Sequence, residues 1–299
     1  EFNVNVSQLP FWALAVYFFW KGLNFNKDID WIIFGIFSAL GFLSKYLFIY
    51  ILISLFIFFV LNFKKYRASI RGYFLSIFIS LILLVPHFFW LFENNYATVF
   101  YALNRTGLSE FSMINHLKNP IEFLIKQIIL LIPFFLMIST ILKKIKLKIN
   151  KKDKKTLFLL SINLIPILLM LVTSLISGAK IRTMWMTPFY LYFGVLFIYT
   201  LKSQINIKRT NSFLYGFLFL FFLSPIIYSY VSISQTDKRT DYPGKEIASK
   251  VQLIWSKDFN GEIQFVTGDE WKAGNLSYHL KSRPVWEGST NNEILKNAS

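Results

Sequence analysis

The stretch WIIFGIFSALGFLSKYLFIYILISLFIFFVLN, residues 31–62, is an apolar block interrupted only by Ser44 and Lys45. A helix rises about 1.5 Å per residue and must cover about 30 Å to cross the hydrocarbon of a bilayer. The block is too long for one crossing and just long enough for two short ones. It therefore predicts two membrane-spanning helices that meet at a break at Lys45, at one face of the membrane.

The whole chain has the composition of a membrane protein. Of its 299 residues, 55% are hydrophobic, 19% are aromatic and 16% are charged, and the mean hydropathy is +0.47. This composition is too apolar for a soluble domain of that length. The chain has no cysteine, which excludes disulfides and thiolate metal sites. The predicted fold class is an all-α polytopic membrane protein.

Other apolar runs of similar length recur along the chain, and together with the two halves of the block they give about eight predicted spans. These are Leu9–Trp20, Trp31–Ser44, Tyr46–Asn62, Tyr73–Leu91, Ile121–Leu142, Leu157–Ile176, Met186–Leu201 and Phe213–Val231.

The formal net charge of +16 indicates membrane orientation and not nucleic-acid binding, because the lysines and arginines gather in links between spans. Cytoplasmic loops carry the excess of these residues. The richest links are Lys64–Arg71, Lys143–Lys155 and Lys202–Arg209, and all three fall on one side if the spans number eight. The opposite, extracytoplasmic face then holds Lys45 and the loop at residues 93–120.

The stretch SGAKIRTMWMTP, residues 177–188, also falls on the extracytoplasmic face. Its Lys180 and Arg182 oppose the cytoplasmic bias of cations, so topology alone does not explain them. Arginine offers phosphate a planar bidentate fork and lysine offers a compact charge. Trp185 adds a stacking face for a sugar ring or a prenyl chain. The stretch therefore predicts an anion-binding site.

Two further features of this face allow two interpretations each. A charge at membrane depth such as Lys45 is costly unless it is paired, so Lys45 either binds a phosphate headgroup or snorkels to the interface. The run Val85–Tyr96, which contains His87, either is an aromatic belt with a polar rim or lines a pocket. The outward carboxylates before the C-terminal tail do not predict a catalytic base; they are Glu1, Glu93, Glu110 and Glu122.

The composition changes to that of a soluble domain near the C-terminus. The chain is therefore divided into a transmembrane domain, residues 1–232, and a small extracytoplasmic α/β domain, residues 233–299. A turn at Tyr242–Gly244 precedes an amphipathic helix, and Glu262–Val266 alternates like a strand. The start at Glu1 without an initiator methionine, and the polar end at Ser299, lead us to expect a piece of a longer protein.

Several short segments form an ordered set over nearly the whole chain. They are Leu9–Tyr17, Gly35–Tyr46, Val85–Trp90, Phe100–Gly107 with Arg105, Asn119–Pro133, Lys180–Pro188, Tyr242–Lys245 and Ala273–Tyr278. This set resembles the membrane glycosyltransferases of family 39, which are the protein mannosyltransferases and aminoarabinose transferase-like enzymes of the GT-C class.

The resemblance implies a GT-C helical bundle, a polyprenyl-phosphate sugar donor and catalysis at the extracytoplasmic face. It also implies that Lys45 lies near the lipid phosphate and that Lys180–Trp185 is a similar cationic and aromatic segment. The family's acidic catalytic motif lies upstream of the matched region, so the catalytic base is unknown and is expected outside this chain. Asn5 and Ser7–Gln8 stand where relatives often carry an Asp-containing stretch, and no role is carried onto them.

The sequence thus predicts a multi-pass enzyme of the inner membrane that transfers a hexose or pentose from a polyprenyl-phosphate donor to an acceptor hydroxyl, with inversion. Its expected partners are membrane lipid and the lipid-linked donor, without nucleic acid. No cofactor or metal is predicted, although a divalent metal stays open. The predicted substrate-binding residues are Lys45, His87, Arg105, Lys180, Arg182 and Trp185.

Two other classes of protein are alternatives. A lipid-carrier flippase or a solute transporter would also need cations within the membrane, but such proteins tend to show paired repeats and broken helices at the midplane. The sequence shows neither feature. A non-catalytic membrane scaffold would leave the cations on one face unexplained.

Overall fold

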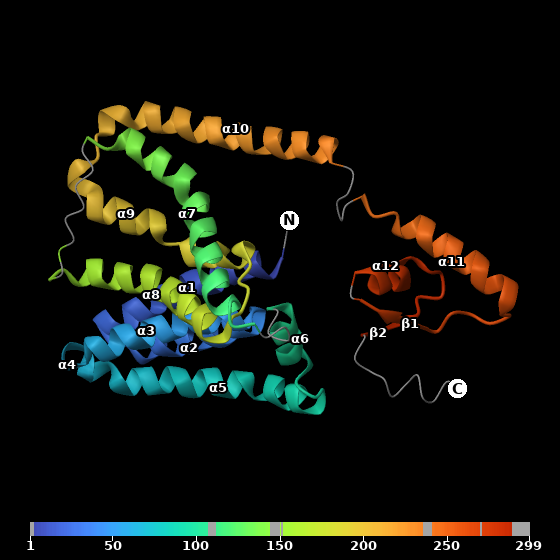
Figure 1. Cartoon of the computed structure of the whole chain (residues 1–299). Helices are drawn as coiled ribbons and strands as arrows, with labels where there is room; N and C mark the ends of the chain where they lie inside the picture. The colour runs from blue at the N-terminus through green and yellow to red at the C-terminus, as the bar shows by residue number, and fades with distance from the viewer. Residues whose placement is uncertain are drawn as a thin grey trace. The chain divides into compact units, whose positions relative to one another are not determined.

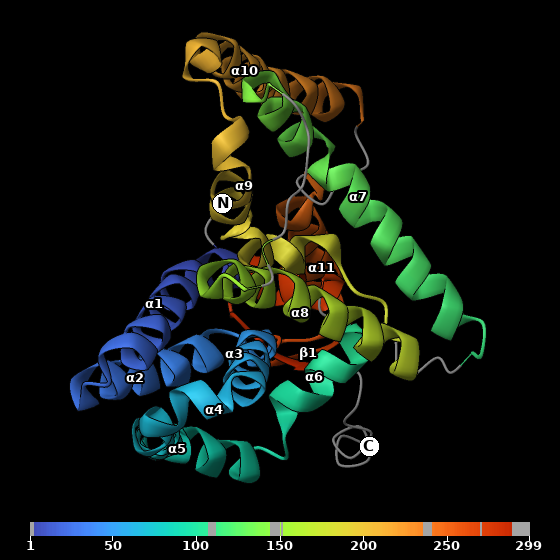
Figure 2. The same cartoon turned by 90° about the vertical axis from the view of Figure 1, so that its left-hand side faces the viewer.

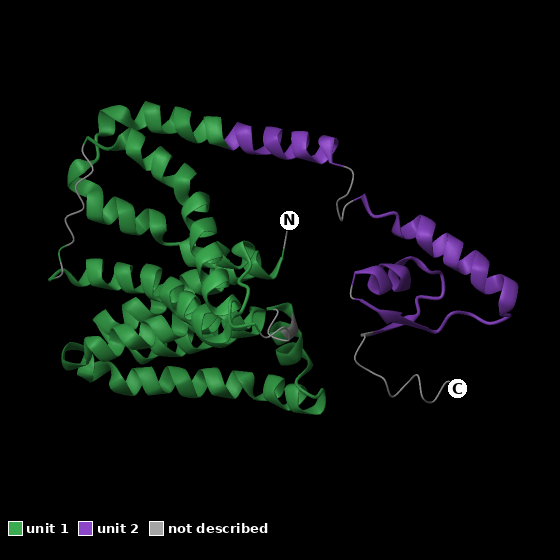
Figure 3. Cartoon of the chain, viewed as in Figure 1, with its two compact units in different colours: residues 1–220 green, residues 221–299 purple. Residues whose placement is uncertain are grey.

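The computed structural model describes residues 3–106, 112–143, 150, 152–235, 241–269 and 271–288. The chain divides into two compact units, residues 1–220 and 221–299 (Figure 3). Each unit is described by itself. The predicted domain boundary after residue 232 stays a prediction.

Unit 1 is built from helices (Figure 1), and the all-α membrane fold class is confirmed. The α-helices are α1 (Val4–Phe25), α2 (Asp28–Ser44), α3 (Ile49–Leu61), α4 (Phe63–Tyr66), α5 (Ile70–Glu93), α6 (Ala97–Arg105), α7 (Asn115–Ile141), α8 (Lys154–Ser177), α9 (Phe193–Leu201) and α10 (Thr210–Ser234), which continues into unit 2. Short 3₁₀ helices connect them: η1 (Tyr46–Phe48), η2 (Arg67–Ser69), η3 (Thr183–Tyr190), η4 (Lys202–Gln204) and η5 (Ile207–Arg209).

Among the described residues, four helical segments are long and apolar enough to cross a membrane: Phe63–Glu93, Asn115–Ile141, Lys154–Ser177 and Ile207–Ser234. The number rises to five if Thr183–Tyr190 and Phe193–Gln204, which are bent by 47° to each other, form one span. These segments coincide with the last five predicted spans.

The predicted count of eight is not confirmed, and the difference lies in the first three spans. The α1 helix carries the polar residues Asn5, Gln8 and Lys21 within its length. The α2 helix has only 17 residues, and Tyr46–Leu61 is also a shorter apolar helix. Polar residues and short length therefore separate these helices from the other spans.

Trp31, at the start of α2, determines how α1, α2 and α5 pack. Its side chain is 0% exposed and lies between Gly22 of α1 and Gly72 of α5. A Cβ atom added at Gly72 would stand 2.1 Å from Cδ1 of the indole, and one added at Gly22 would stand 2.7 Å from Cε2. Small residues let helix backbones approach closely in a membrane. The two glycines therefore make the space that the tryptophan fills.

The α8 helix lies in the middle of unit 1. The helices α1, α2, α3 and α5 lie on one side of it and α7 and α9 on the other (Figures 1 and 2). Phe158 of α8 stacks on Phe19 of α1 at 6.2 Å and meets Phe58 of α3 edge-on at 5.1 Å. Ile162 and Met170 continue the same core along α8.

One end of this bundle holds the start of α2 and the end of α3, the two termini that are far from Lys45. We call it the basic end. There the Asn26 amide donates to the carbonyl of Ala68 at 3.4 Å, and Arg71 pairs with Asp28 at 3.2 Å. Asp30 is 1% exposed and is neutralised by Lys21 at 2.9 Å. Because Phe58 meets Phe158 near the start of α8, the start of α8 lies at the basic end too.

The other end, which we call the Lys45 end, holds the end of α2 and the start of α3. The hydroxyl of Tyr50, near the start of α3, donates to Thr173, near the end of α8, at 2.9 Å. Lys45 and the segment that follows α8 therefore lie at the same end of the bundle.

Unit 2 contains the second half of α10 and a small α/β fold of α11 (Gly244–Asp258), β1 (Phe265–Gly268), α12 (Lys272–His279) and β2 (Val285–Gly288). The two strands pair in parallel, with Phe265 opposite Val285. The helix predicted after Tyr242–Gly244 is confirmed as α11. The strand predicted at Glu262–Val266 overlaps β1 only at its end, because pairing with the distant β2 fixes the strand register.

Replacing Gly72 by alanine is expected to destabilise the bundle, because the new methyl group would overlap the buried Trp31 indole. Overpacking of this kind costs about 1–3 kcal/mol. Gly216→Ala is the matched control, since its Cβ atom would meet Thr140 at an ordinary 3.9 Å. Thermal unfolding in detergent measures both variants, and equal midpoints would contradict the close packing of Trp31.

Candidate functional site

Lys45 is the single non-helical residue between α2 and η1, with an extended backbone at φ −169° and ψ 133°. The predicted break is therefore confirmed. Gly41, one turn before the end of α2, makes the break compact, because a Cβ atom there would lie 2.3 Å from the ring of Phe48. Phe48 is buried against this glycine and turns the chain back into α3.

The Lys45 ammonium has two neighbours from distant segments. It donates a hydrogen bond to Oδ1 of Asn5 in α1 at 2.5 Å, and it lies 5.0 Å from the ring centroid of Trp185 in η3. The amide oxygen and the indole ring both attract the ammonium, but neither carries a negative charge that would neutralise it. Burial lowers the pKa of Lys45 from 10.5 to about 8. The side chain is thus a half-buried cation at neutral pH.

The next residue, Tyr46, connects Lys45 to His87. The Tyr46 hydroxyl lies 2.8 Å from Nε2 of His87 and 2.7 Å from Oγ1 of Thr98, near the start of α6. The His87 ring also stacks on Trp90, with the centroids 6.0 Å apart. His87 therefore lies at the Lys45 end and is joined to Lys45 through its chain neighbour.

The segment between α8 and η3 is anchored by backbone and side-chain hydrogen bonds. Gly178 ends α8 in the left-handed region, at φ +70°, where its amide donates to the carbonyl of Ser174 at 2.8 Å. Its own carbonyl accepts from the side-chain amide of Asn119 at 2.6 Å. The amide of Lys180 donates to the carbonyl of Thr106 at 2.9 Å. The end of α6 and the start of α7 thus hold this segment in place.

Side chains alternate along the segment, as they do in extended chain. Ala179 and Ile181 are buried, whereas Lys180 is exposed and Arg182 is half-buried. Arg182 lies one turn before Trp185, whose amide donates to its carbonyl at 3.0 Å. Both cations therefore point away from the core, on the segment that leads into Trp185.

Arg105 is the last residue of α6, one position before Thr106. Its guanidinium lies 5.8 Å from the ring centroid of Tyr101. The backbone bond from Lys180 to Thr106 places the end of α6 beside the cationic segment. All six predicted residues therefore lie at the Lys45 end. Trp185 contacts two of the others: its ring lies against the Lys45 ammonium and its amide donates to the carbonyl of Arg182.

Two polar residues of this end were given no role from the sequence. Asn5 is 5% exposed and holds Lys45, and Gln8 is 0% exposed, one turn further along α1. Within the described residues, neither amide atom of Gln8 has a hydrogen-bond partner. An unpaired buried polar group costs about 1–3 kcal/mol. The signal available in the sequence is the pair of amides one helical turn apart at the start of an apolar helix.

Among the described residues, neither carboxylate considered as a base pairs with Lys45, although Glu122 lies within electrostatic range of Lys180. Glu122 pairs with Lys126 within α7, and Glu93 is exposed at the end of α5. Glu1 and Glu110 lie outside the described residues. The described residues contain no group of three or more histidine and acidic side chains that could hold a metal ion. The expectation that no cofactor is required stays a prediction.

Comparison with known proteins gives one match, to the first part of the chain. The model of the dolichyl-phosphate-mannose-protein mannosyltransferase family matches residues 1–90, which include Asn5, Lys45 and His87. This match indicates a membrane glycosyltransferase of the GT-C type. Over these residues it confirms the resemblance to the protein mannosyltransferases and aminoarabinose transferase-like enzymes of family 39; the resembling segments after residue 90 lie outside the match. No curated protein and no solved structure matches the chain.

Gly178→Ala is expected to destabilise the segment that carries Lys180 and Arg182. The left-handed backbone conformation costs a residue with a side chain about 1–2 kcal/mol of stability. The new Cβ atom would also stand 3.2 Å from Nε2 of His116. Hydrogen exchange of residues 178–182 should become faster and the thermal midpoint should fall. Gly274→Ala is the control, because its Cβ atom would meet nothing within 4 Å. Unchanged exchange in Gly178→Ala would show that the turn does not hold the segment.

Proposed function

We propose that this membrane glycosyltransferase takes its sugar from a polyprenyl-phosphate donor and transfers it to an acceptor hydroxyl at the Lys45 end. The observation that carries the proposal is the meeting of Lys45 with Trp185. A half-buried cation and an aromatic face converge from α2 and η3, with Asn5 of α1 holding the ammonium. A sugar phosphate needs this combination, because the phosphate requires a cation and the sugar ring requires a flat apolar surface.

The proposed reaction is a direct displacement. The acceptor oxygen attacks the anomeric carbon and forms the new glycosidic bond, while the bond from that carbon to the phosphate oxygen breaks. The electron pair stays on the leaving phosphate, and the acceptor proton goes to a base. The anomeric configuration is inverted.

Lys45 would act on the leaving phosphate, since fixed cations stabilise charge that develops in the transition state. Partial burial strengthens this interaction, because charges interact more strongly where water is scarce. Lys180 and Arg182 would contribute from the anchored segment that leads into Trp185. His87 and Arg105 would lie along the acceptor or the sugar.

The distribution of charge supports an extracytoplasmic position for this site. The basic end contains Lys64 and Lys65 beside α3 and Lys154 and Lys155 at the start of α8. Such clusters favour the cytoplasmic side. The Lys45 end would then face outward, where lipid-linked sugars meet their acceptors.

Lys45→Ala and Arg182→Ala are each expected to reduce sugar transfer by about 10- to 100-fold, since a charge-assisted hydrogen bond contributes about 1.5–3 kcal/mol. The assay measures release of polyprenyl phosphate from a panel of lipid-linked hexoses and pentoses in membranes that contain the full-length protein. Lys64→Ala removes the same charge at the basic end and should leave transfer unchanged. Full turnover in both site variants would exclude the headgroup role. Movement of the lipid across the vesicle without sugar release would support a flippase instead.

Donor binding is also expected to weaken as the pH rises through about 8. The pKa of Lys45 is lowered to about 8 by burial, and a bound phosphate favours the protonated amine. Affinity is therefore full below this pKa and falls above it, as the amine loses its proton. Lys45→Arg should remove the dependence between about pH 7 and 9, because a guanidinium stays protonated there. An identical pH profile in both proteins would contradict the assignment to Lys45.

A further inference from the structure

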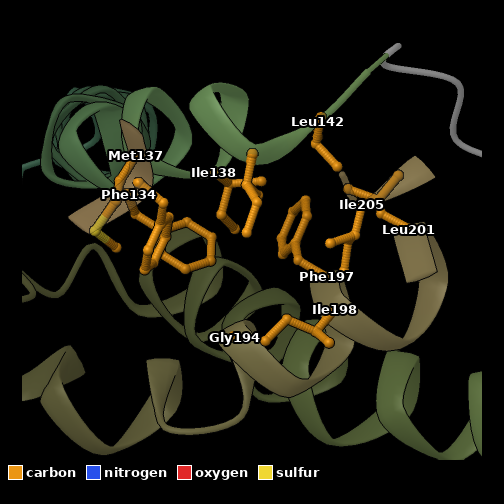
Figure 4. Close-up of a pocket in the computed structure, with 11 residues that line it drawn as sticks. Phe134, Met137, Ile138, Leu142, Gly194, Phe197, Ile198, Leu201 and Ile205 are labelled. Atoms are coloured by element: carbon orange, nitrogen blue, oxygen red, sulfur yellow. The ribbon is translucent and has the colours of Figure 1, made fainter. Parts of the chain in front are cut away.

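A cavity of about 270 Å³ lies between α7 and α9 in unit 1 (Figure 4). Its wall is wholly apolar and includes Met137 and Ile138 of α7 and Phe197 and Ile198 of α9. The α7 helix has 27 residues and so extends about 40 Å. Its start bonds the segment with Gly178 and its end lines the cavity, so the cavity lies far from Lys45 along α7.

One edge of the cavity, around Leu142 and Ile205, has a defined backbone structure, and we call this edge the rim. Leu142 and Ile205, which both line the cavity, form an isolated antiparallel bridge. The amide of Lys143 donates to the carbonyl of Gln204 at 3.0 Å. The guanidinium of Arg209 donates to the carbonyl of Leu142 at 3.0 Å. These bonds hold the ends of α7 and η4 together at the rim.

Exposed lysines follow the residues of this rim along the chain. Leu142 and Leu201 line the cavity, and each is followed directly by a lysine, Lys143 and Lys202. Both lysines and the nearby Lys208 are exposed. The ammonium of Lys202 lies over the ring of Tyr199, 4.6 Å from its centroid.

The rim has little acidic charge to balance these lysines. In the stretches 139–157 and 196–212 of the sequence, the single carboxylate is Asp153. Its oxygen accepts hydrogen bonds from the hydroxyl of Thr156 at 2.7 Å and from its amide at 3.1 Å, at the start of α8. Asp153 also accepts a hydrogen bond from the hydroxyl of Tyr199, over whose ring Lys202 lies. One carboxylate balances at most one of the three lysine charges, so the rim keeps a net positive charge.

We propose that the cavity binds an acyl chain of an anionic phospholipid, with the lipid phosphate held by Lys143, Lys202 and Lys208. A wholly apolar cavity does not hold water, so a hydrocarbon chain is the fitting occupant within a bilayer. Basic side chains beside such a cavity attract anionic headgroups of the adjacent leaflet. This site is independent of sugar transfer and lies at the other end of α7 from the donor site.

Gly194 permits a direct test, because it lines the cavity and a Cβ atom added there would meet nothing within 4 Å. Gly194→Leu would extend a side chain into the cavity without a clash at its base. Leucine is also a better helix former than glycine. The variant should therefore fold as well as the natural chain, which thermal unfolding checks. Gly194→Ala is the matched control that leaves most of the cavity open.

The measurement is titration of the purified full chain with dioleoyl phosphatidylglycerol or dioleoyl phosphatidylcholine, followed by native mass spectrometry of retained lipid. The natural chain should bind phosphatidylglycerol at least about tenfold more tightly, given the effect of several lysines near an anionic headgroup. Gly194→Leu should lose this tight binding, and Gly194→Ala should keep it.

The lysines are tested by a triple variant, Lys143→Gln with Lys202→Gln and Lys208→Gln, which should bind the two lipids alike. The control removes three charges elsewhere at the basic end, through Lys64→Gln, Lys65→Gln and Arg67→Gln, and should keep the preference. Equal binding of both lipids by the natural chain would overturn the proposal. So would tight binding of phosphatidylglycerol that Gly194→Leu does not reduce.

Discussion

The close packing of one tryptophan between two glycines is the constraint on which the geometry of the first helices depends. Trp31 fills the space that Gly22 and Gly72 leave, so α1 and α5 are held against the start of α2. Since α1 runs back along α2, its first turn returns to the last turn of α2. The bond of Asn5 to Lys45 follows from this arrangement. Packing at one end of the bundle thus sets the neighbours of a cation at the other end.

The two ends use positive charge differently. At the basic end many lysines lie on exposed turns, where we propose that they orient the chain and attract a lipid headgroup beside an apolar cavity. At the Lys45 end the cations are fewer and their positions are fixed by neighbours: Lys45 by Asn5 and Trp185, and Lys180 through its backbone bond to Thr106. Fixed charge stabilises a transition state better than mobile charge, because no reorganisation is needed when the reaction occurs.

Much of this arrangement could be predicted from the sequence, because a bilayer makes apolar length and charge informative. The break at Lys45 was visible as one polar dipeptide within an apolar block, and Trp185 was assigned to the same face as Lys45. The amides of Asn5 and Gln8 could not be assigned, since which face of α1 is buried depends on its packing with α2 and η3. The strand β2 was missed because a short parallel pair depends on a distant partner. The predicted count of eight spans relied on apolar character alone, whereas α1 has polar residues and α2 is short.

The shortness of α2 has a consequence for the lipid around it. Its 17 residues extend about 26 Å, a few ångströms less than the hydrocarbon of a typical bilayer. A membrane adapts to a short apolar segment by becoming thinner beside it. The headgroup layer is then drawn inward next to Lys45, where the helix ends. Under the proposed function, the phosphate of a donor with a long isoprenoid tail could then reach this lysine while the tail stays in the hydrocarbon.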